Sequence, residues 1–376
     1  MSDTRTLSIA ERIANTGGRT SGFDYLRVAL AVSVILSHSF QTSYGRVGDL
    51  ALMLPFRPFV RLILPMFFGL SGYLVVGSLE RCPTLVSFMG LRILRIIPAL
   101  SVEILLSALI LGPILTTHPL AQYLCDPQFY AYFLNVIGYI HFYLPGLFAN
   151  NPLPFYVNEQ LWTIPSELLC YAAIAGLSVA GIIGRRRALL AIALIGQAIW
   201  IVQGVRQGAH GSEGLANSTV LLITFLFGIS FHLYREKIIL SRRLFLASLV
   251  AAIVLGLLPW GAYYMPLPAT YMTIYLGYTN FHRGWIVRSG DYSYGLYLFG
   301  FPVQQMIASL GPWTHHWYLN FVAALGMTAV IAYCSWHFVE RPMLRWRTHL
   351  PGIEDRLVGL FLGVRRREDR VRLGIA

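Results

Sequence analysis

Long apolar stretches alternate along the chain with short polar segments that carry most of its charge. A membrane-spanning helix needs about 20 consecutive apolar residues, and the pattern predicts about ten such helices. We expect them at residues 24–42, 59–79, 96–117, 161–182, 188–205, 216–234, 244–259, 264–281, 291–310 and 318–338. The fold class predicted from this pattern is an all-α polytopic membrane protein.

The composition of the 376 residues strengthens this prediction. Hydrophobic residues make up 56% of the chain and charged residues only 12%, whereas a typical soluble domain carries about 25% charged residues. These values exclude a soluble globular enzyme, a disordered chain and a disulfide scaffold. The four cysteines lack the spacing of a metal or redox site, and no metal is expected.

The net charge of +12 predicts how the chain lies in the membrane. In a soluble protein such a surplus would suggest nucleic acid as a partner, but cytoplasmic loops of membrane proteins also collect arginine and lysine. With the N-terminus inside, 25 of the 29 basic residues fall on the cytoplasmic side. Both termini are therefore expected in the cytoplasm, with the lipid bilayer and not a nucleic acid as the partner of most of this charge.

The same distribution of charge divides the chain into three parts. Residues 128–147 are apolar enough to span the membrane, but a helix there would turn every later basic loop outward. They are therefore predicted to form a re-entrant or interfacial element on the outer side. Residues 1–23 form a cytoplasmic segment, residues 24–345 the membrane domain, and residues 346–376 a basic tail that forms either an amphipathic helix on the inner leaflet or a frayed end.

Ionisable side chains inside a bilayer are costly, so each one marks a candidate functional site. Arg27 and His38 lie eleven residues apart in the first predicted helix, which places both on one face and about 16 Å apart along the axis. Arg27 is then near the inner surface, and His38 lies beyond the middle of the bilayer. A histidine in this position is either a catalytic group or a hydrogen-bonding group between helices.

Glu167 is the natural partner of this histidine. It lies about 9 Å below the start of the fourth predicted helix, which is the same estimated depth as His38. A buried carboxylate needs a partner, so a His38–Glu167 pair is predicted, with either a catalytic or a structural role. Glu103, in the third helix, is expected to pair with Arg92 or Arg95 and to be structural.

Arg92 and Arg95 are three residues apart and share one helix face at the inner surface. Two adjacent guanidinium groups suit a phosphate, which they bind bidentately. Anchoring to lipid headgroups is the alternative role for these two residues.

Six motifs in order along residues 22–345 make the chain resemble the acyltransferase-3 family of integral membrane acyltransferases. They include an arginine followed by ten residues and a histidine, an Arg-x-x-Arg loop and a Trp-Thr-x-x-x-Glu pattern. The six segments are FDYLRVALAVSVILSH, MFFGLSGYLV, LRILRIIPAL, LPGLFANNPLPFYVNEQLWTIPSELLCY, DYSYGLYLFGFPVQQ and SWHFVERPML.

The resemblance implies a membrane-bound O-acyltransferase, most often an O-acetyltransferase. The expected donor is cytoplasmic acyl-CoA, in the first place acetyl-CoA. The expected acceptor is a carbohydrate hydroxyl on an exopolysaccharide, an O-antigen or a lipid-linked sugar, and the expected location is the bacterial inner membrane. Buried ionisable groups and many spans also suit a secondary transporter or flippase of a polar or lipid-linked solute, which is the alternative function.

The resemblance also assigns roles to the candidate residues. Arg27, Arg92 and Arg95 would hold the phosphates of acyl-CoA. His38 would act as general base with Glu167 orienting it, or it would carry the acyl group as a transient acyl-histidine. Five further residues are expected to line the path of the acceptor: Tyr73, Asn158, Trp162, Tyr292 and Tyr294.

Overall fold

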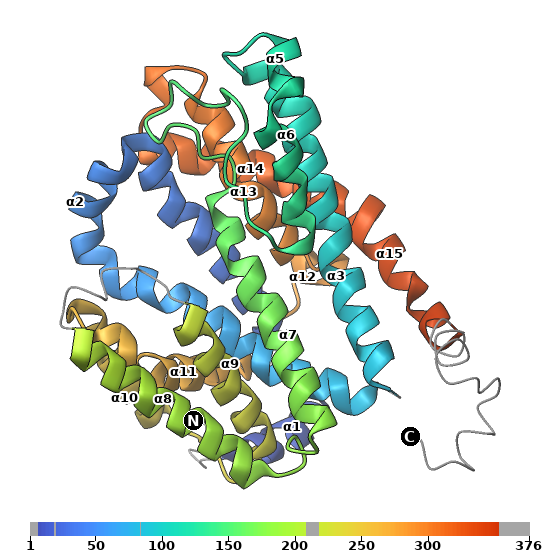
Figure 1. The fold of residues 1–376 in the computed structure, drawn as a ribbon. Helices are drawn as coiled ribbons and strands as arrows, with labels where there is room; N and C mark the ends of the chain where they lie inside the picture. Colours follow the sequence, from blue (N-terminus) through green and yellow to red (C-terminus); the bar gives the residue numbers. More distant parts are fainter. Residues whose placement is uncertain (1–6, 19, 83, 208–217, 353–376) are drawn as a thin grey trace.

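The structure is a computed structural model that describes residues 7–18, 20–82, 84–207 and 218–352, without the side chains of residues 47–54 and 286. Almost all regular structure is helical (Figure 1). The α-helices of eight or more residues are α1 Ile9–Thr16, α2 Gly22–Arg81, α3 Leu85–Leu106, α7 Thr163–Val179, α8 Arg186–Gln207, α9 Ser218–Leu233, α10 Arg242–Leu257, α11 Pro266–Gly277, α13 Ser293–Ala308 and α14 Trp317–Ser335.

Shorter elements connect or extend these helices. Two short strands, β1 Leu7–Ser8 and β2 Ile239–Leu240, pair in an antiparallel way. Two π-helices, η1 Ser107–Leu111 and η7 Trp336–Glu340, continue α3 and α14. The remaining short helices are α4 Gly112–Leu115, α5 Leu120–Cys125, α6 Pro127–Tyr132, η2 Phe133–Ile137, η3 Glu159–Trp162, η5 Gly261–Tyr264, α12 Trp285–Ser289, η6 Pro312–Thr314, α15 Arg341–Arg345 and η8 Trp346–His349.

Six helices among the described residues are long and apolar enough to cross a membrane, so the chain is a multi-pass membrane protein. They are Gly22–Arg46, Pro55–Arg81, Leu85–Leu115, Glu159–Val179, Arg186–Arg206 and Trp317–Gly352. The other four predicted spans also contain helices, but α9, α10 and α13 have 16 residues and α11 has 12. Pro259 follows the end of α10 and Pro266 begins α11, and proline breaks an apolar run into shorter helices because it has no backbone N–H.

Gly45 lets α2 turn back on itself. Its backbone has a φ of 69° and a ψ of −173°, which only glycine adopts without strain. A Cβ at this position would also lie 2.5 Å from the carbonyl oxygen of Pro152. Figure 1 shows the chain rising through the first half of α2 and descending after the bend. One continuous segment therefore contributes two helices to the interior of the molecule.

The second half of α2 crosses α9 at very short range. A Cβ on Gly72 would lie 2.1 Å from the carbonyl oxygen of Phe225, and one on Gly228 would lie 2.3 Å from that of Gly69. Small residues allow helix backbones to approach in this way inside a membrane, where packing and not water exclusion holds helices together. This crossing makes α9 one of the most buried helices of the protein.

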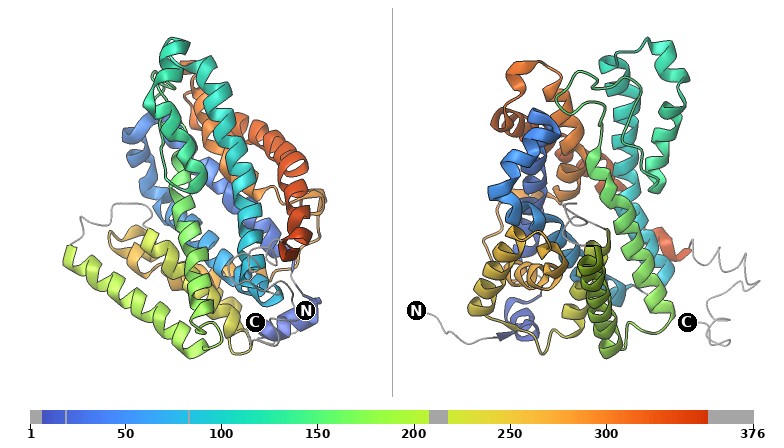
Figure 2. Two further views of the ribbon diagram at one scale, coloured as in Figure 1. Left: turned by 45° about the vertical axis from the view of Figure 1, so that its right-hand side comes forward. Right: turned by 60° about the vertical axis from the view of Figure 1, so that its left-hand side comes forward.

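The two ends of the molecule are built from different helices. Helices α8, α9, α10 and α11 gather near α1, at what we call the α1 end (Figures 1 and 2). Helix α5 and the bend of α2 lie toward the opposite end, which we call the α5 end. The predicted outer segment 128–147 lies toward the α5 end and contains only α6, η2 and irregular chain. Most of the predicted amphipathic tail, residues 353–376, lies outside the described residues.

Hydrogen bonds between buried polar side chains hold α13 beside α2 and α14. Gln304 donates its side-chain amide to the carbonyl oxygen of Ile35 at 2.7 Å. Asn320 donates to the backbone carbonyl of Gln304 at 3.0 Å and is hydrogen-bonded to the hydroxyl of Thr42 at 3.3 Å. These contacts fix the turns of α2 on either side of His38.

The crossing of α2 and α9 predicts the effect of a single methyl group. Gly72→Ala should lower the melting temperature of the detergent-solubilised protein, because the new methyl meets backbone and overpacking costs about 1–3 kcal/mol. Gly176→Ala in α7 is the matched control, since a Cβ there meets nothing within 4 Å. Equal melting temperatures for the two variants would show that the helices do not approach this closely.

Candidate functional site

A cavity of about 630 Å³ opens between α2, α3, α7, α9 and α13. Its wall follows the second half of α2 from Leu64 to Arg81, which lie about 25 Å apart along the helix axis. At one limit it is lined by Arg81, Arg235 and His232, near α1. At the other it is lined by Leu64 and Phe67. The cavity is therefore long and changes in polarity along its length.

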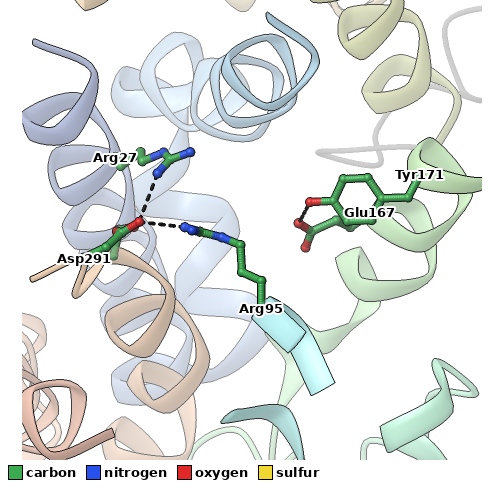
Figure 3. Close-up of polar contacts among 6 residues, drawn as sticks. Arg27, Arg95, Glu167, Tyr171 and Asp291 are labelled. Carbon is green, nitrogen blue, oxygen red and sulfur yellow. Dashed lines mark hydrogen bonds and ion pairs between the residues drawn. The ribbon is translucent and has the colours of Figure 1, made fainter. Parts of the chain in front are cut away.

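Arg27, Arg92 and Arg95 all line this cavity, although they come from two helices. Arg27 and Arg95 share one carboxylate oxygen of Asp291, at 3.0 Å and 2.7 Å respectively (Figure 3). Ser293 donates to the other oxygen of Asp291 at 2.7 Å. The site thus joins α2, α3 and the residues before α13 through a single acidic side chain.

Arg92 has no acidic partner among the described residues. Its guanidinium group donates to the hydroxyl of Ser78 at 2.8 Å and lies over the rings of Phe88 and Tyr171, 5.4 Å and 5.8 Å from their centres. Its Nε atom is buried without a hydrogen-bond partner. Arg92 therefore presents an uncompensated positive charge to the cavity.

Glu167 faces the arginines across the cavity. Its carboxylate accepts a hydrogen bond from the hydroxyl of Tyr171 at 2.6 Å, and Figure 3 shows this pair opposite Arg95 and Asp291. No salt bridge joins Glu167 to another described residue. The carboxylate of Glu167 therefore faces the cavity.

The expected equal depth of Glu167 and His38 is wrong. Thr163, one turn before Glu167, is hydrogen-bonded to Tyr297, and Phe301, one turn after Tyr297, contacts the ring of His38. Helix α7 runs toward the α1 end and α13 toward the α5 end. Glu167 therefore lies closer than His38 to the α1 end. The estimate failed because it assumed that both helices begin at the membrane surface and run straight through it.

His38 lies beyond the cavity, in the half of the molecule toward the α5 end. Its ring packs edge-on against Phe301 with 5.1 Å between the ring centres, and its ring nitrogens make no hydrogen bond to another described residue. The lining nearest to it consists of Phe67, Thr163 and Tyr297. The structure therefore brings the three predicted arginines and Glu167 to one cavity and leaves His38 just outside it.

The five residues expected along the acceptor path fall into two groups. Tyr73 and Tyr294 line the cavity, where Tyr73 is hydrogen-bonded to the hydroxyl of Tyr278 at 2.7 Å and Tyr294 donates to the carbonyl oxygen of Ile96 at 3.0 Å. The other three do not line it. Tyr292 is buried against the rings of Tyr333 and His337.

Asn158 and Trp162 lie at the two ends of η3, just before α7, and Asn158 is bound to Glu103. The Asn158 amide donates to the Glu103 carboxylate at 2.6 Å, and Ser107 donates to the same oxygen at 2.7 Å. The expected pairing of Glu103 with Arg92 or Arg95 is therefore wrong. Glu103 lies eight residues after Arg95 on α3, about 12 Å farther along the axis. Trp162 packs partly buried against the main hydrophobic core.

Asp291 and Glu340 are acidic residues that the sequence analysis missed. Asp291 is the first residue of the predicted helix 291–310 and follows a basic inner loop. A carboxylate in this position is a candidate ion-pair partner for the arginines at the inner surface. Glu340 is buried at the end of the π-helix η7, where it accepts a hydrogen bond from Ser335 at 2.9 Å.

A second cluster lies near α1, where Glu80 contacts His232 at 3.1 Å and Arg235 at 3.7 Å.

The charges along the cavity favour an anionic ligand. Five arginines line it but only two carboxylates, those of Glu80 and Glu167. Asp291 offsets one further positive charge. Among the described residues, no group of three or more His, Cys, Asp and Glu side chains is placed to hold a metal ion.

The chain is similar in sequence to known proteins. The chain is 25% identical to a protein of Shigella phage Sf6 named "O-acetyl transferase", over 87% of this chain and 96% of that one. It is 27% identical to "Nodulation protein 10" of Rhizobium leguminosarum bv. viciae, over 89% and 96% of the two chains. No solved structure matches. Residues 20–339 match the family profile described as an acyltransferase domain, so the chain belongs to the acyltransferase-3 family and is a membrane acyltransferase.

Proposed function

We propose that the protein transfers an acyl group, most often acetyl, from cytoplasmic acyl-CoA to a hydroxyl of a carbohydrate acceptor in the bacterial inner membrane. The observation that carries this proposal is the polarity of the cavity, which is cationic over one part and neutral at the limit near Tyr297. Acyl-CoA has the same polarity, with phosphates at one end and a thioester on a long neutral arm. The name of the phage relative supports acetyl as the group.

In this proposal the α1 end is the cytoplasmic end, as the distribution of basic residues predicts. The phosphates of the donor lie among the arginines, and no acidic side chain competes with them for Arg92. Asp291 holds Arg27 and Arg95 in place at the cavity wall. The carboxylate of Glu167 is placed to accept hydrogen bonds from amide N–H groups of the donor's arm.

His38 is the proposed general base. It takes the proton of the acceptor hydroxyl as that oxygen attacks the thioester carbonyl carbon. The carbon–sulfur bond then breaks, and the CoA thiolate leaves and is protonated. In the second route a ring nitrogen of His38 attacks the thioester carbonyl carbon, the carbon–sulfur bond breaks and the CoA thiolate leaves. The acceptor hydroxyl oxygen then attacks the acyl-histidine, the carbon–nitrogen bond breaks, and the released imidazole takes the hydroxyl proton. In the donor-bound state the thioester lies against Tyr297, and both routes require the Tyr297 and Phe301 rings to turn aside for the reaction itself, because these rings separate His38 from the cavity.

The acceptor approaches His38 from the α5 end in either route. Asn158 and Trp162 lie on that side of the cavity, so they remain the proposed acceptor residues. Tyr73 and Tyr294 line the arginine-rich cavity instead, and we reassign them to the donor. Tyr292 is assigned to packing. The enzyme family disfavours the transporter that the buried charges alone left open.

Replacement of His38 tests the chemical step. Purified His38→Ala should lose at least about 100-fold in transfer of radiolabelled acetyl from acetyl-CoA, because a general acid–base group contributes about that much or more. In cells that carry this variant in place of the native protein, mass spectrometry of the surface glycans should show the loss of one acetyl group. His316→Ala, at an exposed histidine beside Tyr318, is the matched control. Near-native transfer by His38→Ala would remove His38 from the mechanism.

Replacement of Arg92 tests the donor site. Arg92→Ala should weaken acetyl-CoA binding about 10- to 100-fold, because a hydrogen bond to a charged group contributes about 1.5–3 kcal/mol. Arg288→Ala is the control, since this exposed arginine of α12 does not line the cavity. If both variants bind acetyl-CoA as the native protein does, Arg92 has no part in donor binding.

A further inference from the structure

The end of the cavity away from the α1 end has a defined wall. Leu64 and Phe67 of α2 form one side of it, and Thr163 and Tyr297 form the other. The rings of Phe67 and Tyr297 meet edge-to-face, with 6.0 Å between their centres. No charged side chain belongs to this part of the lining, in contrast to the arginine-rich remainder.

Hydrogen bonds fix the position of the Tyr297 ring. Its hydroxyl is 2.6 Å from the hydroxyl of Thr163 and donates to the carbonyl oxygen of Gln160 at 3.0 Å. The side chain of Gln160 in turn donates to the carbonyl oxygen of Leu298 at 2.7 Å. A ligand that displaces the ring must break these bonds in a region with little water, where unsatisfied polar groups are costly.

We propose that Tyr297 and Phe67 determine which acyl chain lengths the enzyme accepts. This inference rests on the proposed function, because it requires the donor's phosphates to lie among the arginines. The thioester arm then runs away from the arginines, and its acyl group meets the wall made by the two rings. An acetyl group adds one methyl beyond the thioester carbonyl, whereas a longer chain must push Tyr297 away from Thr163 and Gln160.

The proposal assigns a specific consequence to removal of either ring. Tyr297→Ala and Phe67→Ala open apolar space where the acyl chain ends, so additional methylene groups can be buried there. Two buried methylenes distinguish butyryl from acetyl, and their burial raises affinity about tenfold. Each variant should therefore shift the ratio of butyryl-CoA to acetyl-CoA affinity by about tenfold in favour of butyryl-CoA.

The experiment measures binding of acetyl-CoA, butyryl-CoA and free CoA to the purified full-length protein. Tyr297→Phe is the matched control for shape, because it keeps the ring and removes the hydroxyl, and it should keep the native butyryl-to-acetyl ratio more closely than Tyr297→Ala. Phe67→Ala tests the same wall from a different helix. Retained affinity for free CoA identifies the variants that are correctly folded.

The outcomes separate this inference from the function on which it rests. Native protein that binds acetyl-CoA, together with folded Tyr297→Ala and Phe67→Ala variants that keep the native ratio, would overturn the role in chain length and leave the donor site standing. Native protein that binds none of the three compounds would overturn both. A shift toward butyryl-CoA in either ring-deleting variant, without loss of free CoA binding, supports the assignment.

Discussion

The carboxylate of Asp291 is held between the guanidinium groups of Arg27 and Arg95, and all three side chains are largely buried. Isolated buried charges cost several kcal/mol each, and removing one member of a buried pair leaves the other uncompensated. The three residues come from α2, α3 and the segment before α13, so their pairing fixes how these helices meet. Two arginines for one carboxylate also leave a net positive charge, which the position of Arg92 increases.

The existence of the helices could be predicted from the sequence, but their lengths could not. Hydropathy identified an apolar helix in each of ten segments because burial in lipid demands it. It placed the break between residues 259 and 264, but it could not show that α11 covers only Pro266–Gly277 instead of residues 264–281. The reversal of α2 depends on the positive φ of Gly45. The sequence does not distinguish this glycine from the other glycines among the 34 in the chain.

The candidate arginines could be selected from the sequence because ionisable groups near a membrane are few and costly. Their partner Asp291 could not be identified in the same way, because pairing between helices depends on tertiary packing. The apolar pattern also placed Asp291 at the start of a predicted membrane helix. The relative depth of His38 and Glu167 failed for a related reason. Distances along one helix follow from its rise per residue, whereas a comparison across two helices also needs their tilt and starting points.

The hydrogen-bonded wall at Tyr297 has a consequence for the cell that contains the protein. A hydrophilic cavity that reaches deep into a membrane protein threatens the permeability barrier, because water within it can carry ions and protons down their gradients. The ring of Tyr297, tied to Thr163 and packed against Phe67, ends the cavity before His38. In the proposed function, a charged donor would thus bind from one side while this ring blocks a continuous path for water through the protein.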